Sequence, residues 1–181
     1  EQLNHLNIEN NRFLFDVTPN LRREMESRKN RFKDKDDVIP LLRGKVQQTF
    51  SKNHGFSGVH IFTESMDIPD EFGTGPRLVV LPPNATFTNG DENEAFIKGE
   101  EILRSRGNQP RLKQNRLLFL AIDADVVMRL KEHARTYLAW SSIVDDINSE
   151  TLVLDTVQVK QAKKQLSESE KTLQQMVRDG Y

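Results

Sequence analysis

The sequence contains no cysteine, and this absence excludes disulfide bonds, thiolate zinc sites, iron–sulfur clusters and a cysteine nucleophile. No apolar run approaches the roughly 18 residues that a membrane-spanning helix needs, so we expect no membrane partner. Neither sign of charge dominates, because the sequence has 26 Lys and Arg and 27 Asp and Glu, which gives a net charge of −1. That balance excludes a globally basic nucleic-acid binder, although a local basic patch remains compatible with it. The lack of cysteine also indicates a reducing compartment, and we expect a cytoplasmic protein.

The 181 residues suit one domain, or one domain with a helical appendage. Hydrophobic residues make up 36% and charged residues 29%, which is typical of a globule with a large helical surface. We expect an α/β domain over residues 1–150 and a C-terminal helical extension over 151–181, which can pack on the same domain. Because the sequence begins at Glu1 rather than Met, we expect a segment of a larger protein.

Four short segments predict β-strands. Arg12–Val17 alternates polar and apolar residues around Phe13 and Phe15, the pattern of a half-buried strand. Three apolar runs predict the others: Val59–Phe62, Leu78–Leu81 and Leu117–Ile122. The last two runs are continuously apolar, which is typical of strands that are covered on both faces. The sequence therefore predicts an α/β fold, with a mixed sheet of about four strands and helices on both faces.

Two helices are expected between the first predicted strand and the three apolar runs. Thr18, followed by Pro19, is a helix cap with proline in the first turn, and this helix runs to about Phe32. Asp37 can cap a second helix, in which apolar residues recur every four positions and which ends near Gly55.

Three further helices follow. One of them, over about 92–106, joins the last two apolar runs into a right-handed βαβ unit. Another runs from Asp123 to about Asp146. The last, over about 152–178, is amphipathic with a narrow apolar stripe, so it either folds back on the preceding helix or meets a partner helix.

A catalytic site is not evident from the motifs. Asp123 follows an apolar strand, as in the magnesium site of P-loop ATPases, but that chemistry also needs a phosphate loop. The sequence offers only Gly44-Lys45 followed by Val46, so the phosphate loop is absent from this segment. Asp123 or Asp125 is more simply the N-cap of the next helix, and an enzymatic site around them is the least favoured hypothesis.

Metal and cofactor sites are not predicted either. His54, His60 and Glu64 lie close in sequence, but their spacing matches no zinc or di-metal site. The glycines Gly73 and Gly75 lack the following helix start that would present amides to a phosphate. We therefore expect no catalytic residue, no metal and no cofactor in this segment.

One segment concentrates positive charge. Between Glu101 and Asp123 the chain has no acidic residue and five basic ones: Arg104, Arg106, Arg111, Lys113 and Arg116. Held before a buried strand, they can form a patch that contacts nucleic-acid phosphates or an acidic protein surface. The alternative is a solvated loop with structural salt bridges. No aromatic residue is interleaved, so base stacking is not supported.

Several segments in a fixed order carry a family resemblance. They are Phe15–Leu21, Ile68–Asp70, Arg77–Pro83, Asn115–Ala121 with Asp123, and Arg135–Ile143. Together they resemble a region downstream of the nucleotide-binding domain in large prokaryotic P-loop ATPases. That family is catalogued as a domain of unknown function, and its members often occur in anti-phage defence gene clusters. The resemblance implies a parent chain that binds ATP and magnesium, with the phosphate loop outside this segment.

The expected function is therefore that of a non-catalytic accessory or interaction domain of a larger prokaryotic ATPase. Its partners would be the remainder of its parent chain, another protein or a second copy. Four apolar residues on the last two helices are the candidate partner contacts: Trp140, Leu166, Leu173 and Met176. The alternative function is contact with nucleic-acid phosphates through residues 104–116.

Overall fold

The computed structural model describes residues 6–9, 12–15, 20–50, 55–70, 75–90 and 93–181. The chain divides into two compact units. The helical unit comprises Glu1–Phe32 and Arg135–Lys171, and the sheet unit comprises Lys33–Ala134 and Thr172–Tyr181. Because each unit takes two separate stretches of chain, neither coincides with the expected segments 1–150 and 151–181.

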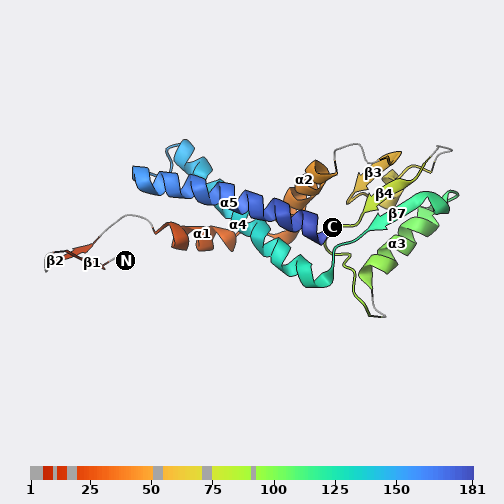
Figure 1. Cartoon of the computed structure of the whole chain (residues 1–181), viewed down its shortest axis with the longest axis horizontal. Coiled ribbons are helices and arrows are strands. Elements are labelled where there is room, and N and C mark those ends of the chain that lie inside the picture. The colour runs from red at the N-terminus through yellow and green to blue at the C-terminus, as the bar shows by residue number, and fades with distance from the viewer. Residues whose placement is uncertain (1–5, 10–11, 16–19, 51–54, 71–74, 91–92) are drawn as a thin grey trace. The chain divides into compact units, whose positions relative to one another are not determined.

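The sheet unit contains three parallel strands in the order β3 (Gly58–Ile61), β4 (Arg77–Val80) and β7 (Leu117–Leu120) (Figure 1). The α/β prediction is confirmed, whereas the mixed sheet of about four strands is corrected to three parallel strands. The remaining predicted strand, β2 (Arg12–Phe15), pairs antiparallel with β1 (Leu6–Glu9) in a separate hairpin. An alternating pattern identifies a strand but not its partner, which is why the sequence assigned β2 to the wrong sheet.

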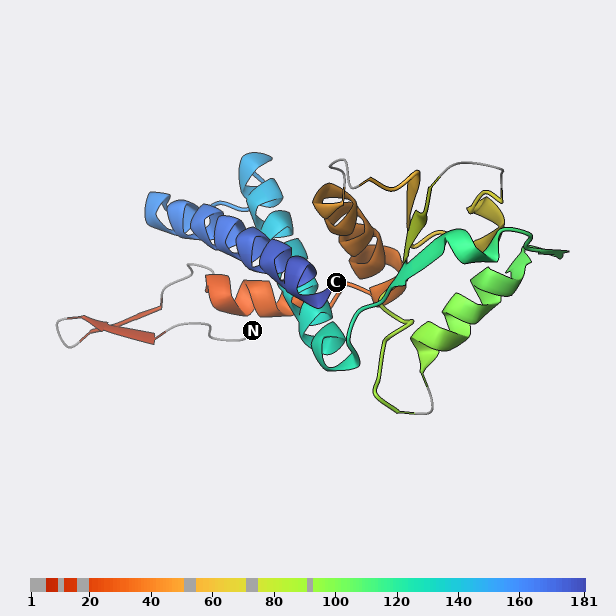
Figure 2. The ribbon, with the colours of Figure 1, turned by 45° about the vertical axis from the view of Figure 1, so that its right-hand side comes forward.

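The predicted βαβ unit is confirmed by β4, α3 (Glu94–Arg104) and β7. Val79 and Leu81 pack against Ala95 and Ile102 of α3 in one core cluster, with Phe119 at its margin. Asn93 fixes the start of α3, because its side-chain oxygen accepts hydrogen bonds from the N–H groups of Ala95 and Phe96. In both views α2 (Ile39–Thr49) lies on the other side of the sheet from α3 (Figures 1 and 2).

The starts of the first two helices differ from the predictions. Asn20 caps α1 (Leu21–Lys29), accepting from the N–H groups of Arg22 and Arg23, while Thr18 and Pro19 lie outside the described residues. A π-helical turn (Asp34–Val38) precedes α2, and the Asp37 carboxylate accepts from the N–H of Lys33 at 2.8 Å. Asp37 thus reaches back to the chain before it instead of capping the turn that follows.

Small elements complete the sheet unit. A hairpin of β5 (Ser105–Arg106) and β6 (Gln109–Pro110) follows α3. One 3-10 turn (Ser65–Asp67) follows β3, and another (Gln114–Arg116) directly precedes β7. The two longest helices are α4 (Ala124–Asn148) and α5 (Thr156–Gly180). Among the described residues, no helix combines the length and apolar character that a membrane span requires.

The last helix packs on its own chain within each unit. In the helical unit, Ala162 is buried with Leu21 and Ile143. In the sheet unit, the Tyr181 hydroxyl donates to the Leu81 carbonyl at 3.2 Å, and the Tyr181 and Phe62 rings are 6.2 Å apart. Of the two alternatives that the sequence left open for this helix, these contacts correspond to packing on its own chain.

Candidate functional site

One of the five residues of the candidate basic patch, Arg111, is buried and cannot contribute to it. Only 3% of it is exposed, and its guanidinium donates to the carbonyls of Ile102 at 2.8 Å, Ser65 at 3.1 Å and Ile68 at 3.2 Å. Burial lowers the Arg111 pKa, and the Asp70 carboxylate opposes that effect. With the Pro69 carbonyl at 3.4 Å, Arg111 holds four backbone carbonyls, so it is a structural residue and is not available to a phosphate.

The other four basic residues are also drawn into local contacts or partly covered. Arg104 pairs with Glu100 at 2.5 Å on the same helix, and Arg106 donates to the Met66 carbonyl at 3.0 Å. Lys113 and Arg116 are half-buried. The contacts of Arg104 and Arg106 fit the alternative that the sequence left open, a solvated loop with structural salt bridges.

Asp70 fixes the loop that carries Arg111. Its carboxylate accepts from the N–H groups of Leu112 at 2.6 Å and Lys113 at 2.8 Å. Burial acts to raise the Asp70 pKa, but the two donors together with the charges of Arg111 and Arg106 outweigh it, and the pKa is lowered. The charge of Asp70 is therefore used inside the fold.

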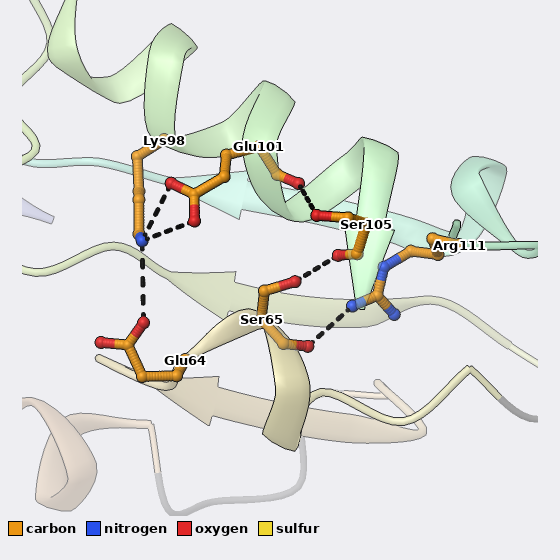
Figure 3. A network of polar contacts seen from close by, with 6 residues as sticks. All are labelled: Glu64, Ser65, Lys98, Glu101, Ser105 and Arg111. Atoms are coloured by element: carbon orange, nitrogen blue, oxygen red, sulfur yellow. Dashed lines mark hydrogen bonds and ion pairs between the residues drawn. The ribbon is translucent and has the colours of Figure 1, made fainter. Parts of the chain in front are cut away.

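A polar network ties α3 to the turn after β3 (Figure 3). Lys98 pairs with Glu101 at 3.1 Å and with Glu64 at 3.7 Å. The Ser65 hydroxyl donates to the Ser105 carbonyl, and the Ser65 carbonyl accepts from Arg111. These contacts join segments about 40 residues apart in sequence, so the network is structural.

A cavity of about 320 Å³ lies at the carboxyl ends of β3 and β4, where parallel sheets commonly bind ligands. Phe62 lines it with a left-handed backbone (φ 50°), and Thr63, Glu64, Asn84 and Lys98 contribute polar groups. Glu64 and Lys98 already pair with each other, and the Thr63 hydroxyl donates to the Ile61 carbonyl at 3.3 Å. Within the described lining no nucleophile is hydrogen-bonded to a base.

Asp123 caps α4, which confirms the simpler of the two interpretations. Its carboxylate accepts from the N–H of Asp125 at 2.7 Å, and its carbonyl accepts from the N–H groups of Val126 and Val127 in the first turn.

His60 lies beside a cation, since its Nε2 is 3.5 Å from Arg77 Nη1. Among the residues that the structure describes, no cluster of three metal-ligating side chains is present.

Two of the four predicted partner contacts lie in the protein interior. Trp140 is 6% exposed in the helical core, and Leu173 is fully buried. Leu166 packs against the helical core, and Met176 is half-buried. An apolar stripe in sequence cannot distinguish a helix that packs on its own chain from one that meets a partner, and Trp140 and Leu173 are core residues.

An apolar groove that the sequence did not reveal lies between α3 and β7. It has a volume of about 490 Å³ and is lined by Ala95, Phe96, Gly99, Glu100, Leu103 and Phe119; we call it the α3–β7 groove. Phe96 is 68% exposed, and its ring meets that of Phe87 edge to face, with centroids 6.0 Å apart. The sequence signal for this groove was the pair of adjacent apolar residues Phe96 and Ile97 in a predicted helix. Only one side of α3 can face the sheet, so the sheet cannot cover every apolar residue of that helix.

The strand beside this groove is an edge strand. β7 pairs with β4 on one side, and among the described residues no strand pairs with its other side. Leu118 of β7 is 50% exposed, so the expectation that its apolar run is covered on both faces is wrong at this position. The cause is that the sheet stops at three strands and leaves β7 at its edge. The apolar side chains of the α3–β7 groove thus lie next to the outer edge of β7, with which no described strand pairs.

Comparisons of the chain with protein-family models, with curated proteins and with solved structures find no match.

Proposed function

We propose that this chain is a non-catalytic interaction domain that binds another protein surface at the α3–β7 groove. The observation that carries the proposal is the open apolar groove beside the unpaired edge of β7. Exposed apolar patches and bare strand edges are costly in an isolated protein, and natural proteins cover them with a partner or protect them with charge. β7 is entirely apolar, Leu117 to Leu120, and carries no protective charge within the strand.

The resemblance to large prokaryotic ATPases supplies the context of the proposal. In that setting the domain is an accessory part of a cytoplasmic, defence-associated ATPase, and ATP and magnesium bind elsewhere in the parent chain. The Asp123 carboxylate acts as a helix cap, which agrees with a segment that does not perform the chemistry itself. Contact with nucleic acid is less well supported, because Arg111 is buried.

Site-specific photo-crosslinking in cells tests the proposal. A photoreactive amino acid replaces Phe96 in the groove or, as the control, Arg43, which is exposed on α2. We expect a protein adduct from position 96 and none from position 43. Gly99→Leu should remove the adduct, since a side chain there meets only the Phe119 ring, at 3.8 Å, and extends into the groove. Equal adducts from both positions, or no adduct from position 96, would overturn the proposal.

A further inference from the structure

We infer that the occupant of the α3–β7 groove is a second copy of this chain, paired antiparallel with the first through β7 about a two-fold axis. The inference rests on the proposed function and identifies its partner. It follows from the direction of the backbone groups of β7, from the match of that strand with its own reverse, and from the position of α3 beside it.

The outer edge of β7 has backbone groups available for pairing. The Leu120 carbonyl accepts from the N–H of Leu81, and the Ile122 carbonyl accepts from that of Phe87, both at 2.8 Å. Leu120 and Ile122 therefore turn their backbone groups toward β4 and the loop that follows it. Because successive residues of a strand face opposite sides, Phe119 and Ala121 turn theirs toward the outer edge.

A two-fold axis perpendicular to the sheet at Phe119 gives an apolar match along the strand. Phe119 then lies opposite the partner's Phe119, and Leu117 lies opposite the partner's Ala121 as a hydrogen-bonded pair. On the other face of the sheet, Leu118 lies opposite the partner's Leu120. The half-exposed Leu118 side chain would be covered by this pairing, which accounts for the continuous apolar run of β7.

The charges at the strand ends favour the antiparallel direction. Arg116 precedes β7 and Asp123 follows it. In the antiparallel register, Arg116 lies opposite the partner's Ile122, so the partner's Asp123 is its neighbour at both ends of the interface. A parallel pairing would instead place like charges at the same end. The charges therefore select a direction, and the apolar residues supply most of the free energy.

The two α3 helices would lie on the same face of the joined sheet, one on each side of the axis. Each α3–β7 groove would then face the other, and Gly99 leaves room there because it has no side chain. The exposed parts of Phe87, Phe96 and Leu118 amount to about 300 Å² per copy, given about 200 Å² for a whole aromatic residue. A standard interface buries about 800 Å² per partner, so we expect a reversible dimer that depends on concentration.

Analytical ultracentrifugation of the intact chain tests the inference over about 1–200 μM. The mass should rise with concentration from 20.9 kDa toward twice that value. Phe96→Glu and Leu118→Glu should keep the chain monomeric at every concentration, and both positions are exposed enough to tolerate the change. Met128→Glu is the matched control, because Met128 is 76% exposed and lies on α4 outside the groove. A wild-type chain that stays monomeric throughout would overturn the inference.

The register can be tested with single cysteines, because the chain has none of its own. A hydrogen-bonded antiparallel pair has Cα atoms about 5.5 Å apart, which a disulfide spans. Phe119→Cys should therefore give a disulfide-linked dimer readily under mild oxidation, and Leu118→Cys, whose counterpart is two residues out of register, should do so more slowly. The reverse order, or dimers from Met128→Cys at the same rate, would contradict this pairing.

The crosslinking experiment separates this inference from the proposed function. An adduct of twice the chain mass from position 96 supports both. An adduct with a different protein supports the proposed function and overturns the second copy as its partner. The absence of any adduct overturns the proposed function and, with it, this inference.

Discussion

At the scale of single residues, Arg111 shows that the role of a charged side chain depends on what surrounds it. In the sequence it is one of five cations in a loop without acids. In the structure its fork of N–H donors reaches carbonyls from α3 and from the turn after β3, which no local pattern brings together. Asp123 is the opposite case. An acid directly before a helix is a local signal, and its capping role was predictable from the sequence.

The first prediction concerns Arg111. Arg111→Ala should lower the free energy of unfolding by about 3 kcal/mol or more, because it leaves buried carbonyls without donors. Arg104→Ala is the control and should change it by less than about 0.5 kcal/mol, since its ion pair with Glu100 is exposed. Urea denaturation of the three proteins measures the difference. Similar small effects at both positions would show that Arg111 does not hold the loop.

The second prediction concerns His60. Burial lowers its pKa below the usual value, and the neighbouring Arg77 and Arg111 lower it further. The folded state therefore disfavours the charged imidazole, and the unfolded state binds more protons below about pH 6.5. The contribution of neutral His60 to the free energy of unfolding should be complete above that pH and should fall as the pH drops below it. The loss should level off once the pH is below the folded-state pKa.

His60→Gln provides the comparison for this pH dependence, because the chain contains three other histidines. Urea unfolding at about pH 7.5 and about pH 5.5 should show a smaller acid loss of stability in the variant than in the parent. An equal loss in the two proteins would mean that the neutral form of His60 is not favoured by the fold.

At the scale of elements, periodicity predicted where chain segments become helix or strand, and pairing decided the rest. The βαβ unit of β4, α3 and β7 was predictable, because each of its parts has a strong local pattern. The hairpin of β1 and β2 was not, since its residues pair with their sequence neighbour and leave the main sheet with three strands. The α3–β7 groove follows from that shorter sheet. It could not be predicted without knowing which strand lies at the edge.

The third prediction compares two helix caps. Asn93→Ala should cost more stability than the roughly 1 kcal/mol expected for Asn20→Ala. Both side chains accept from two backbone N–H groups, but Asn93 is buried and also donates to the Thr88 carbonyl at 2.6 Å. Asn20 is exposed, so water can replace its hydrogen bonds. Thermal or urea unfolding measures both variants, and a larger loss for Asn20→Ala would contradict the role of burial.

At the scale of the whole molecule, the division into two units was hidden from the sequence. Each unit joins an early stretch of chain to a late one, and local sequence patterns do not show which distant stretches pack together. Trp140 and Leu173 illustrate the consequence. Both belong to apolar stripes that fit a partner helix, and both are covered by the chain itself. Local pattern therefore identified the amphipathic helices correctly but not what they pack against.

The charge of the whole molecule leads to the last prediction, which concerns nucleic acid. The net charge is −1, and of the five cations in residues 104–116 Arg111 is buried, while Arg104 and Arg106 contact Glu100 and a backbone carbonyl. That leaves few cations of the segment for phosphate contacts, and the half-buried Arg116 is the first to test. A protein that neutralises two phosphates loses about tenfold in DNA affinity between 50 and 200 mM salt, whereas one that contacts six or more loses about a thousandfold or more. Fluorescence anisotropy with a labelled duplex should therefore show weak binding with a shallow salt dependence, and Arg116→Ala should flatten it further.

A steep salt dependence that Arg104→Ala and Arg106→Ala reduce would instead mean that the segment releases its internal contacts to bind phosphates. The nucleic-acid function would then replace the docking function proposed for this chain.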